Sequence, residues 1–141
     1  MSNREQAEFP SRLTVLAEMA AFAQTFCERN GVDRTDALRL TFIIEELFTN
    51  TIRHGFGGDS DSQVRIELVS GDGELSLLYE DSAPPYDPID RFAPPASLAA
   101  TVDARPIGGL GVYLLGQLIS RARYAYEDGC NRLWLIVPRE G

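Results

Sequence analysis

TFIIEELFTN, residues 41–50, places two adjacent glutamates and an asparagine among large apolar side chains, on what the spacing predicts to be one helix. Residues four apart share a helix face, so Glu46 and Asn50 are neighbours, with Arg53 and His54 one turn further along the same side. A carboxylate can accept a proton and an amide oxygen can bind Mg²⁺, which makes the pair a candidate catalytic site. Taken alone, the pair is also compatible with a solvent-facing strip.

The elements around this helix follow from periodicity and turn residues. Apolar spacing of three and four predicts helices, and alternation predicts β-hairpins. Between the two hairpins lies a proline-rich stretch with little periodicity, which predicts a long loop. The predicted elements are a helix over 11–29, a helix from Asp33 or Thr35 to Gly55, a hairpin over 64–81, a loop over 82–109, a helix over 110–122 and a hairpin over 123–138 turning at Asp128-Gly129.

This order predicts an α+β fold, because helices and strands are largely segregated along the chain. We expect a two-layer α/β sandwich with the helices packed on one face of a mixed, largely antiparallel sheet. The chain has 141 residues, which predicts a single domain over residues 1–141.

Composition excludes several classes of protein. The sequence has no apolar run long enough to cross a membrane, and its start lacks a signal pattern, so a cytoplasmic protein without a membrane partner is expected. Cys27 and Cys130 have no metal-type spacing, so they are expected to be reduced packing residues. His54 is the only histidine, which excludes a histidine-rich metal site.

The charged residues narrow the function further. The formal net charge of −8 argues against direct nucleic-acid binding and suits a basic protein partner. All thirteen basic residues are arginines, so a P-loop and a eukaryotic-type protein kinase, which both need a lysine, are excluded. A bound phosphate would have to be held by backbone N–H groups, arginine or a metal ion.

Two further motifs flank the long loop. GGLG, residues 108–111, precedes an apolar helix, where free N–H groups and the helix dipole can bind an anion. Asp81 ends a strand in YEDSAPPYDP and could accept a hydrogen bond from a ligand amino group. Each motif alone is equally compatible with an ordinary turn.

Taken together, these motifs resemble the GHKL (Bergerat-fold) ATPase superfamily, and within it the bacterial anti-sigma factor serine-protein kinases. EELFTNTIRHG is similar to the N-box, DSAPPYDP to the G1 box and GGLGVYLL to the G2 box. The resemblance implies that Glu46 is the general base and that Asn50 holds Mg²⁺. The N-box also contains Arg53 and His54.

The other two boxes imply the nucleotide contacts. Asp81 of the G1 box would receive the adenine amino group. The G2 box would approach the phosphates through the backbone of Gly109 and Gly111, with Gly108 and Leu110 beside them. Residues 82–109 correspond to the ATP lid, in which Arg105 is the candidate phosphate ligand and Arg91 the second choice.

The implied function is that of an ATP- and Mg²⁺-dependent kinase that phosphorylates a serine of an anti-anti-sigma (STAS-type) partner and regulates a sigma factor by partner switching. A homodimer is left open. The alternative is a non-catalytic nucleotide-binding interaction module of the same fold. Ala83 favours that alternative, because the G1 box usually has glycine there and alanine adds a methyl group near the expected adenine position.

Overall fold

Five strands form one sheet in the computed structural model, which describes residues 3–92 and 109–141. The sheet order is β1-β2-β3-β5-β4, and every pairing between neighbouring strands in the described part of the chain is antiparallel. The strands are β1 (Arg4–Pro10), β2 (Gln63–Gly71), β3 (Glu74–Asp81), β4 (Arg121–Glu127) and β5 (Cys130–Pro138).

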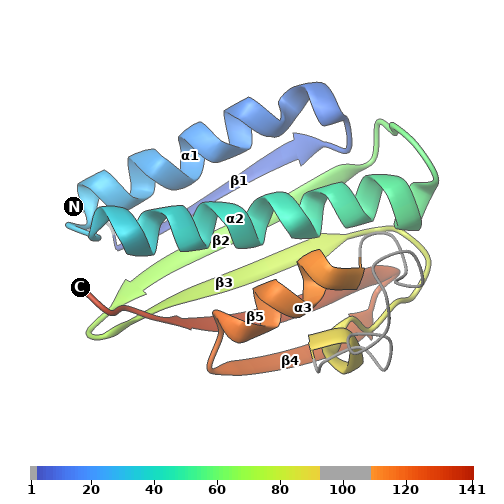
Figure 1. Cartoon of the computed structure of the whole chain (residues 1–141). Helices are drawn as coiled ribbons and strands as arrows, with labels where there is room; N and C mark the ends of the chain where they lie inside the picture. Colours follow the sequence, from blue (N-terminus) through green and yellow to red (C-terminus); the bar gives the residue numbers. More distant parts are fainter. Residues whose placement is uncertain (1–2, 93–108) are drawn as a thin grey trace.

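The helices cover one face of this sheet, as Figure 1 shows. They are α1 (Leu16–Arg29), α2 (Arg34–Asn50) and α3 (Gly109–Gln117). Short turns of other helix types are η1 (Leu13–Val15), η2 (Thr51–Phe56) and η3 (Ile89–Phe92), of which η2 is a π-helical turn. The predicted α+β two-layer sandwich is therefore confirmed.

The core lies between the two layers. Alternate residues of the central strands point toward the helices and are buried, including Ile66, Leu77 and Leu135. From the helices, Phe26 and Phe48 fill the same space and are fully buried. The apolar residues of TFIIEELFTN thus anchor α2 on the sheet and fix the direction in which its polar strip faces.

The N-terminal strand β1 was missed by the sequence reading. Its alternation of apolar and polar residues is weak, because it is an edge strand rich in charged residues. Phe9 is its one buried side chain. The ring of Phe9 meets that of Phe22 edge to face. The helix predicted from residue 11 starts later, because Ser11 is buried and bonds to the carbonyl of Ser62 at the corner after β1.

Two other boundaries differ from the prediction. The third helix ends at Gln117, and residues predicted as its last turn begin β4 at Arg121. Apolar spacing over so short a segment does not separate a helix end from a following strand. The hairpin turn at Asp128-Gly129 is confirmed, with φ of 54° and 76°, the double positive φ of a type I′ turn.

The central helix also has the predicted cap. Asp33 accepts a hydrogen bond from the backbone N–H of Thr35 at 3.3 Å. At its other end α2 continues into η2 before Gly57, whose φ of 73° stops the turn. A π-helical turn changes the angular spacing of side chains, which matters for residues 51–56.

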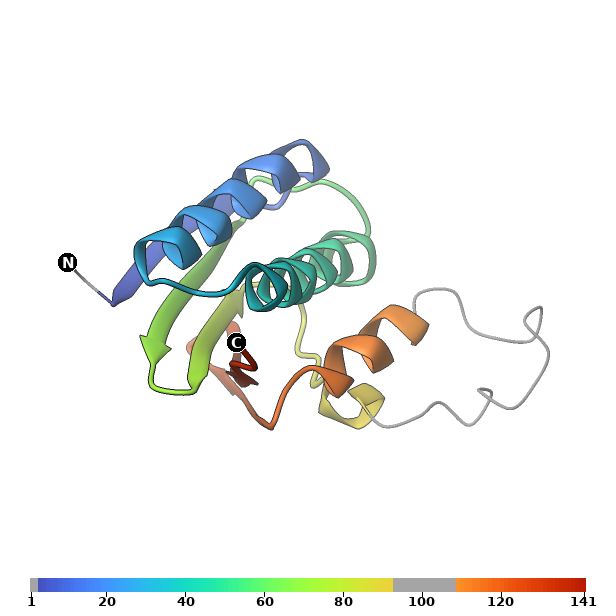
Figure 2. The ribbon, with the colours of Figure 1, turned by 60° about the vertical axis from the view of Figure 1, so that its left-hand side comes forward.

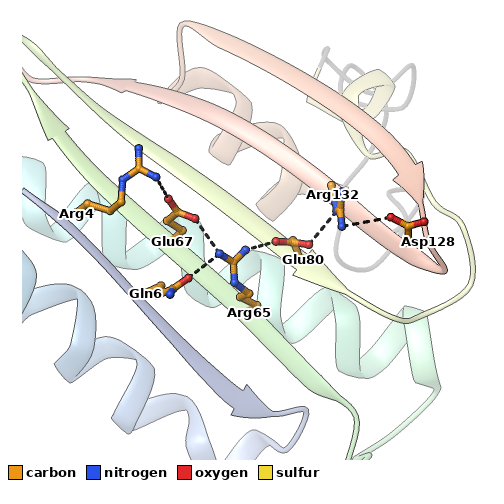
Figure 3. A network of polar contacts seen from close by, with 7 residues as sticks. All are labelled: Arg4, Gln6, Arg65, Glu67, Glu80, Asp128 and Arg132. Carbon is orange, nitrogen blue, oxygen red and sulfur yellow. Dashed lines mark hydrogen bonds and ion pairs between the residues drawn. The ribbon is translucent and has the colours of Figure 1, made fainter.

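The outer face of the sheet carries paired charges, shown in Figure 3. Arg65 bonds to Gln6, Glu67 and Glu80. The whole network consists of Arg4, Gln6, Arg65, Glu67, Glu80, Arg132 and Asp128.

Cys27 and Cys130 are both free, in agreement with the sequence. Within residues 3–92 and 109–141, no helix is long and apolar enough to span a membrane.

Candidate functional site

A cavity of about 350 Å³ lies beside the C-terminal end of α2. Its walls come from α2, η2, the end of β3, the loop that follows β3, α3 and the strands β4 and β5. The volume is within the range of small-molecule sites. Its polar lining residues include Asn50, His54, Asp81, Arg91, Tyr124 and Asn131.

Asp81 is the buried carboxylate of this cavity, with 8% of its surface exposed. Its Oδ1 accepts the side-chain amide of Asn131 at 2.9 Å and the backbone N–H of Ala83 at 3.1 Å. Its Oδ2 accepts the hydroxyl of Thr51 at 2.8 Å. Since a carboxylate has about four acceptor positions, one position on Oδ2 stays open to a ligand.

The hydroxyl of Thr51 is also hydrogen-bonded to Tyr79. Thr51 Oγ1 lies 2.8 Å from the hydroxyl of Tyr79 and 3.0 Å from the carbonyl of Leu47. A carboxylate can only accept, so when Thr51 donates to Asp81 its oxygen is free to accept the Tyr79 proton. Burial raises the pKa of Tyr79 well above its ordinary value, which keeps this phenol a donor.

Asn131 ties the carboxylate to the start of the long loop. Asn131 lies directly opposite Asp81 in the β3–β5 pairing. Its amide nitrogen also donates to the carbonyls of Ala83 and Pro84, at 3.0 and 3.2 Å. Its oxygen accepts the backbone N–H of Tyr86 at 2.9 Å and the hydroxyl of Tyr124. If the amide were flipped, its oxygen would face Asp81 Oδ1 and the two carbonyl oxygens, which are all acceptors. These partners therefore fix its orientation.

Glu46, on α2, is not among the described residues that line the cavity, but its carboxylate lies beside Gly111 in the first turn of α3. A side chain at Gly111 would meet the Glu46 carboxylate, with Cδ of Glu46 2.9 Å from the added Cβ. The glycine of the predicted G2 box therefore makes room for the carboxylate. Burial raises the pKa of Glu46, Glu45 raises it further, and Arg53 opposes the shift. A half-buried glutamate with a raised pKa has the character of a general base.

The other residues predicted from the helix divide into two groups. Asn50 and His54 line the cavity, as expected for a polar strip that faces a ligand. Arg53 is exposed and is absent from the lining residues of the described part, because the π-helical turn changes the register of η2. Its positive charge lowers the pKa of Glu46, against the effects of burial and Glu45.

Ala83, the departure from the G1 pattern, fits its surroundings. Asp128 is the one non-glycine residue with positive φ in the described part of the chain, so the backbone at Ala83 does not require glycine. The methyl group is buried and packs against Gly55, where an added Cβ would lie 2.8 Å from it. The small residue at 55 thus accommodates the extra methyl at 83.

The first part of the predicted lid has one contact within itself and one with α3. Arg91 lines the cavity and stacks over the ring of Tyr86, with its guanidinium carbon 5.6 Å from the ring centroid. The turn η3 lies beside α3 in Figures 1 and 2. There a Cβ at Gly116 would lie 2.8 Å from the backbone of Phe92, so the two segments touch closely.

The remaining predicted residues lie at the start of α3 or outside the described residues. Arg105 and Gly108 lie outside the described residues. Gly109 and Leu110 open α3, so the helix starts one residue earlier than predicted from the paired glycines.

The sequence reading missed four polar residues of the cavity. They are Thr51 on η2, Tyr79 on β3, Tyr124 on β4 and Asn131 on β5. A usable signal existed at Asn131. It occupies the inward series that continues with Leu133, Leu135 and Val137, so a polar residue there is unusual.

No group of three or more His, Cys, Asp or Glu side chains that could hold a metal occurs among the described residues. A Mg²⁺ ion that is bound to a nucleotide needs few protein ligands, because phosphate oxygens and water complete its coordination. Asn50 is the candidate protein ligand, since its amide lines the cavity on the same helix as Glu46.

Comparison with known proteins gives the context for this geometry. The profile of a family described as histidine kinase-like ATPase domain matches residues 9–137. The serine/threonine-protein kinase BtrW of Bordetella bronchiseptica is 30% identical over 127 residues, which cover 87% of this chain and 88% of that protein. The serine-protein kinase RsbW of Listeria monocytogenes is 25% identical over 94 residues. That match covers 65% of this chain and 60% of the Listeria protein.

The fold agrees with a solved structure as well. A crystal structure of the RsbU and RsbW domains of a Mycobacterium tuberculosis protein superposes with a TM-score of 0.65 and 16% identity. The superposition covers 96% of this chain and 32% of that one. At this identity the likeness concerns the fold alone.

Proposed function

The chain belongs to the histidine kinase-like ATPase domain family, and on this premise we propose that it binds Mg·ATP in the cavity and phosphorylates a serine of a partner protein. Glu46 is the general base, Asn50 holds Mg²⁺, and Asp81 receives the adenine amino group. Gly109 and Gly111 let the phosphates approach the start of α3, and His54 lines the cavity.

The contact of Glu46 with Gly111 is the observation that carries this proposal. It brings a half-buried carboxylate with a raised pKa to the N-terminal turn of α3, where backbone N–H groups favour an anion. A base is thus adjacent to the expected phosphate position. The cavity itself presents the open acceptor position of Asp81.

The chemistry assigned to the chain is a single proton transfer with phosphoryl transfer. Glu46 accepts the proton of the serine hydroxyl while that oxygen bonds to the γ-phosphorus, and the bond from phosphorus to the β–γ bridging oxygen breaks to leave ADP. Mg²⁺ supplies neutralisation of the phosphate charge when it is bound. Asn50 would hold that ion, and Asp81 with Thr51 would orient the adenine ring.

We propose an anti-anti-sigma protein of STAS type as the phosphoacceptor and a sigma factor as the second partner, in the cytoplasm. Two relatives named serine or serine/threonine kinases support the phosphoacceptor residue. The net charge of −8 suits a basic partner surface. Organisation as one domain over residues 1–141 and assembly as a homodimer also stay proposals.

The test is recovery of partners from a bacterial extract on the immobilised chain, in Mg·ATP or in ATP with excess chelator. We expect a small protein that carries new phosphoserine only in the Mg·ATP sample. A partner recovered equally in both samples without phosphoserine would instead support the non-catalytic interaction module.

A further inference from the structure

The amide of Asn131 controls how many acceptor positions the cavity carboxylate offers. Oδ1 of Asp81 is filled by Asn131 and by the backbone N–H of Ala83, while Oδ2 is filled by Thr51 on one side only. Asp81 is nearly buried, so water cannot freely satisfy a ligand group that finds no partner. The carboxylate therefore accepts one N–H from a ligand, not two.

Purine bases differ in the number of donors on the edge that would face this carboxylate. Adenine presents one amino group beside a ring nitrogen that accepts. Guanine presents a ring N–H and an adjacent amino group, a pair that a carboxylate accepts with both of its oxygens. With Oδ1 already filled, one guanine donor would stay unpaired in a buried site, and that lowers affinity.

We propose that Asn131 is a specificity-determining residue that makes Asp81 select adenine over guanine by occupying Oδ1. This inference rests on the proposed nucleotide-binding function and adds a residue to it. Asn131 is well placed for this role because its orientation is fixed on the far side by Tyr86 and Tyr124. Its amide cannot turn away to release Oδ1 without losing those partners.

Removing the amide opens the second oxygen. In Asn131→Ala, Oδ1 keeps the N–H of Ala83 and gains one free position, so guanine can place both donors. Adenine gains nothing from the opening, because it has a single donor on that edge. The preference for ATP over GTP is expected to fall by about tenfold, the scale of one buried unpaired group.

The same substitution also loosens residues 83–86, which bond to Asn131 through their backbone. Loosening would lower the affinities for both nucleotides together and leave their ratio unchanged. The ratio of the two dissociation constants is thus the diagnostic quantity. Tyr124→Phe is the matched control, because it removes a hydroxyl that bonds to Asn131 and Tyr86 but leaves Oδ1 of Asp81 filled.

The experiment is calorimetric titration of the full chain with Mg·ATP and with Mg·GTP, for wild type, Asn131→Ala, Asn131→Leu and Tyr124→Phe, with urea unfolding of each. Asn131→Leu nearly keeps the size and removes the donor, so it gives a second variant if the alanine protein does not fold. We expect a reduced preference for ATP in both Asn131 variants and an unchanged preference in Tyr124→Phe.

An unchanged ATP-to-GTP ratio in folded Asn131 variants that still bind ATP would overturn the role of Asn131 alone. An equal fall of the ratio in Tyr124→Phe would also overturn it, because that variant leaves Oδ1 filled. Wild type that binds neither nucleotide would refute the proposed function itself.

Discussion

Glu80 and Asp81 are neighbours on β3, yet the two faces of the sheet treat their carboxylates in opposite ways. Glu80 faces outward, where Arg65 bonds to one of its oxygens and Arg132 to the other at 2.9 Å. Asp81 faces the helices, and its hydrogen-bond partners are the neutral groups of Thr51, Asn131 and a backbone N–H.

The difference separates a structural carboxylate from one available to a ligand. A carboxylate paired with two cations is neutralised, and its acceptor positions are taken. A buried carboxylate with neutral donors and an open acceptor position stays available to a ligand. Glu46 belongs with Asp81, since its carboxylate is half-buried beside Gly111 and has a raised pKa.

The sharpest way to break this comparison is Glu46→Gln, which keeps size and hydrogen bonding but removes the base. Single-turnover transfer to the partner serine should fall by roughly 10²–10⁴-fold, the scale of general-base catalysis. The dissociation constant for Mg·ATP should barely change, because the proposed role of Glu46 is to accept the serine proton and not to bind the nucleotide. Rapid-quench measurement on the recovered partner gives the rate.

Glu45→Gln is the control for Glu46→Gln. It removes the adjacent charge on the same helix, and that charge raises the pKa of Glu46. A base must be deprotonated to act, so the rate falls as pH drops through the pKa of Glu46. In Glu45→Gln this acid limb should move to lower pH while the plateau rate is kept. Wild-type transfer by Glu46→Gln at every pH would remove the base from the proposal.

A second test compares the two neighbours directly. Asp81→Asn removes the charged acceptor for the adenine amino group, so affinity for Mg·ATP should fall by about 10- to 100-fold, the range for a hydrogen bond to a charged group. Glu80→Gln, one residue away on the other face, should leave that affinity within about twofold, because its carboxylate does not reach the cavity. Equal losses in the two variants would show that β3 as a whole matters and not the face.

How much of this site could be predicted depended on the kind of contact. Glu46, Asn50 and Asp81 are predicted from their offsets in motifs, and the structure places Asn50 and Asp81 on the cavity and Glu46 beside Gly111. Thr51 could not be predicted, because its hydroxyl donates to Asp81 only when β3 and η2, 30 residues apart in sequence, are packed together.

The fold was predicted where local patterns are strong and missed where they are weak. The capped central helix and the hairpins have clear periodicity and turn residues. The strand β1 is set by pairing with β2, a long-range contact that a charged edge strand hardly signals. The contribution of Gly111 also needed the structure, since spacing alone suggested an approach to phosphate and not the contact with Glu46.

The smallest effect is expected on the outer face. Glu80→Gln removes two ion pairs between partly exposed side chains, each worth at most about 1 kcal/mol, so the free energy of unfolding should fall by at most about 2 kcal/mol. Urea denaturation at low and high salt measures it. The difference between wild type and variant should shrink in high salt, because ions screen the pairs. A larger loss that salt does not change would mean that the network is not held by charge.

The two glycine contacts of α3 also determine when this helix exists at all. Isolated helices much shorter than about 12 residues are marginal in water, and α3 has 9 residues. Its order therefore depends on the surfaces against which Gly111 and Gly116 rest, α2 on one side and η3 on the other. Loss of either surface should release the helix, so we expect its backbone amides to exchange with solvent faster than those of α2, which hydrogen exchange would measure. The order of the segment that packs against Glu46 thus depends on its two neighbours.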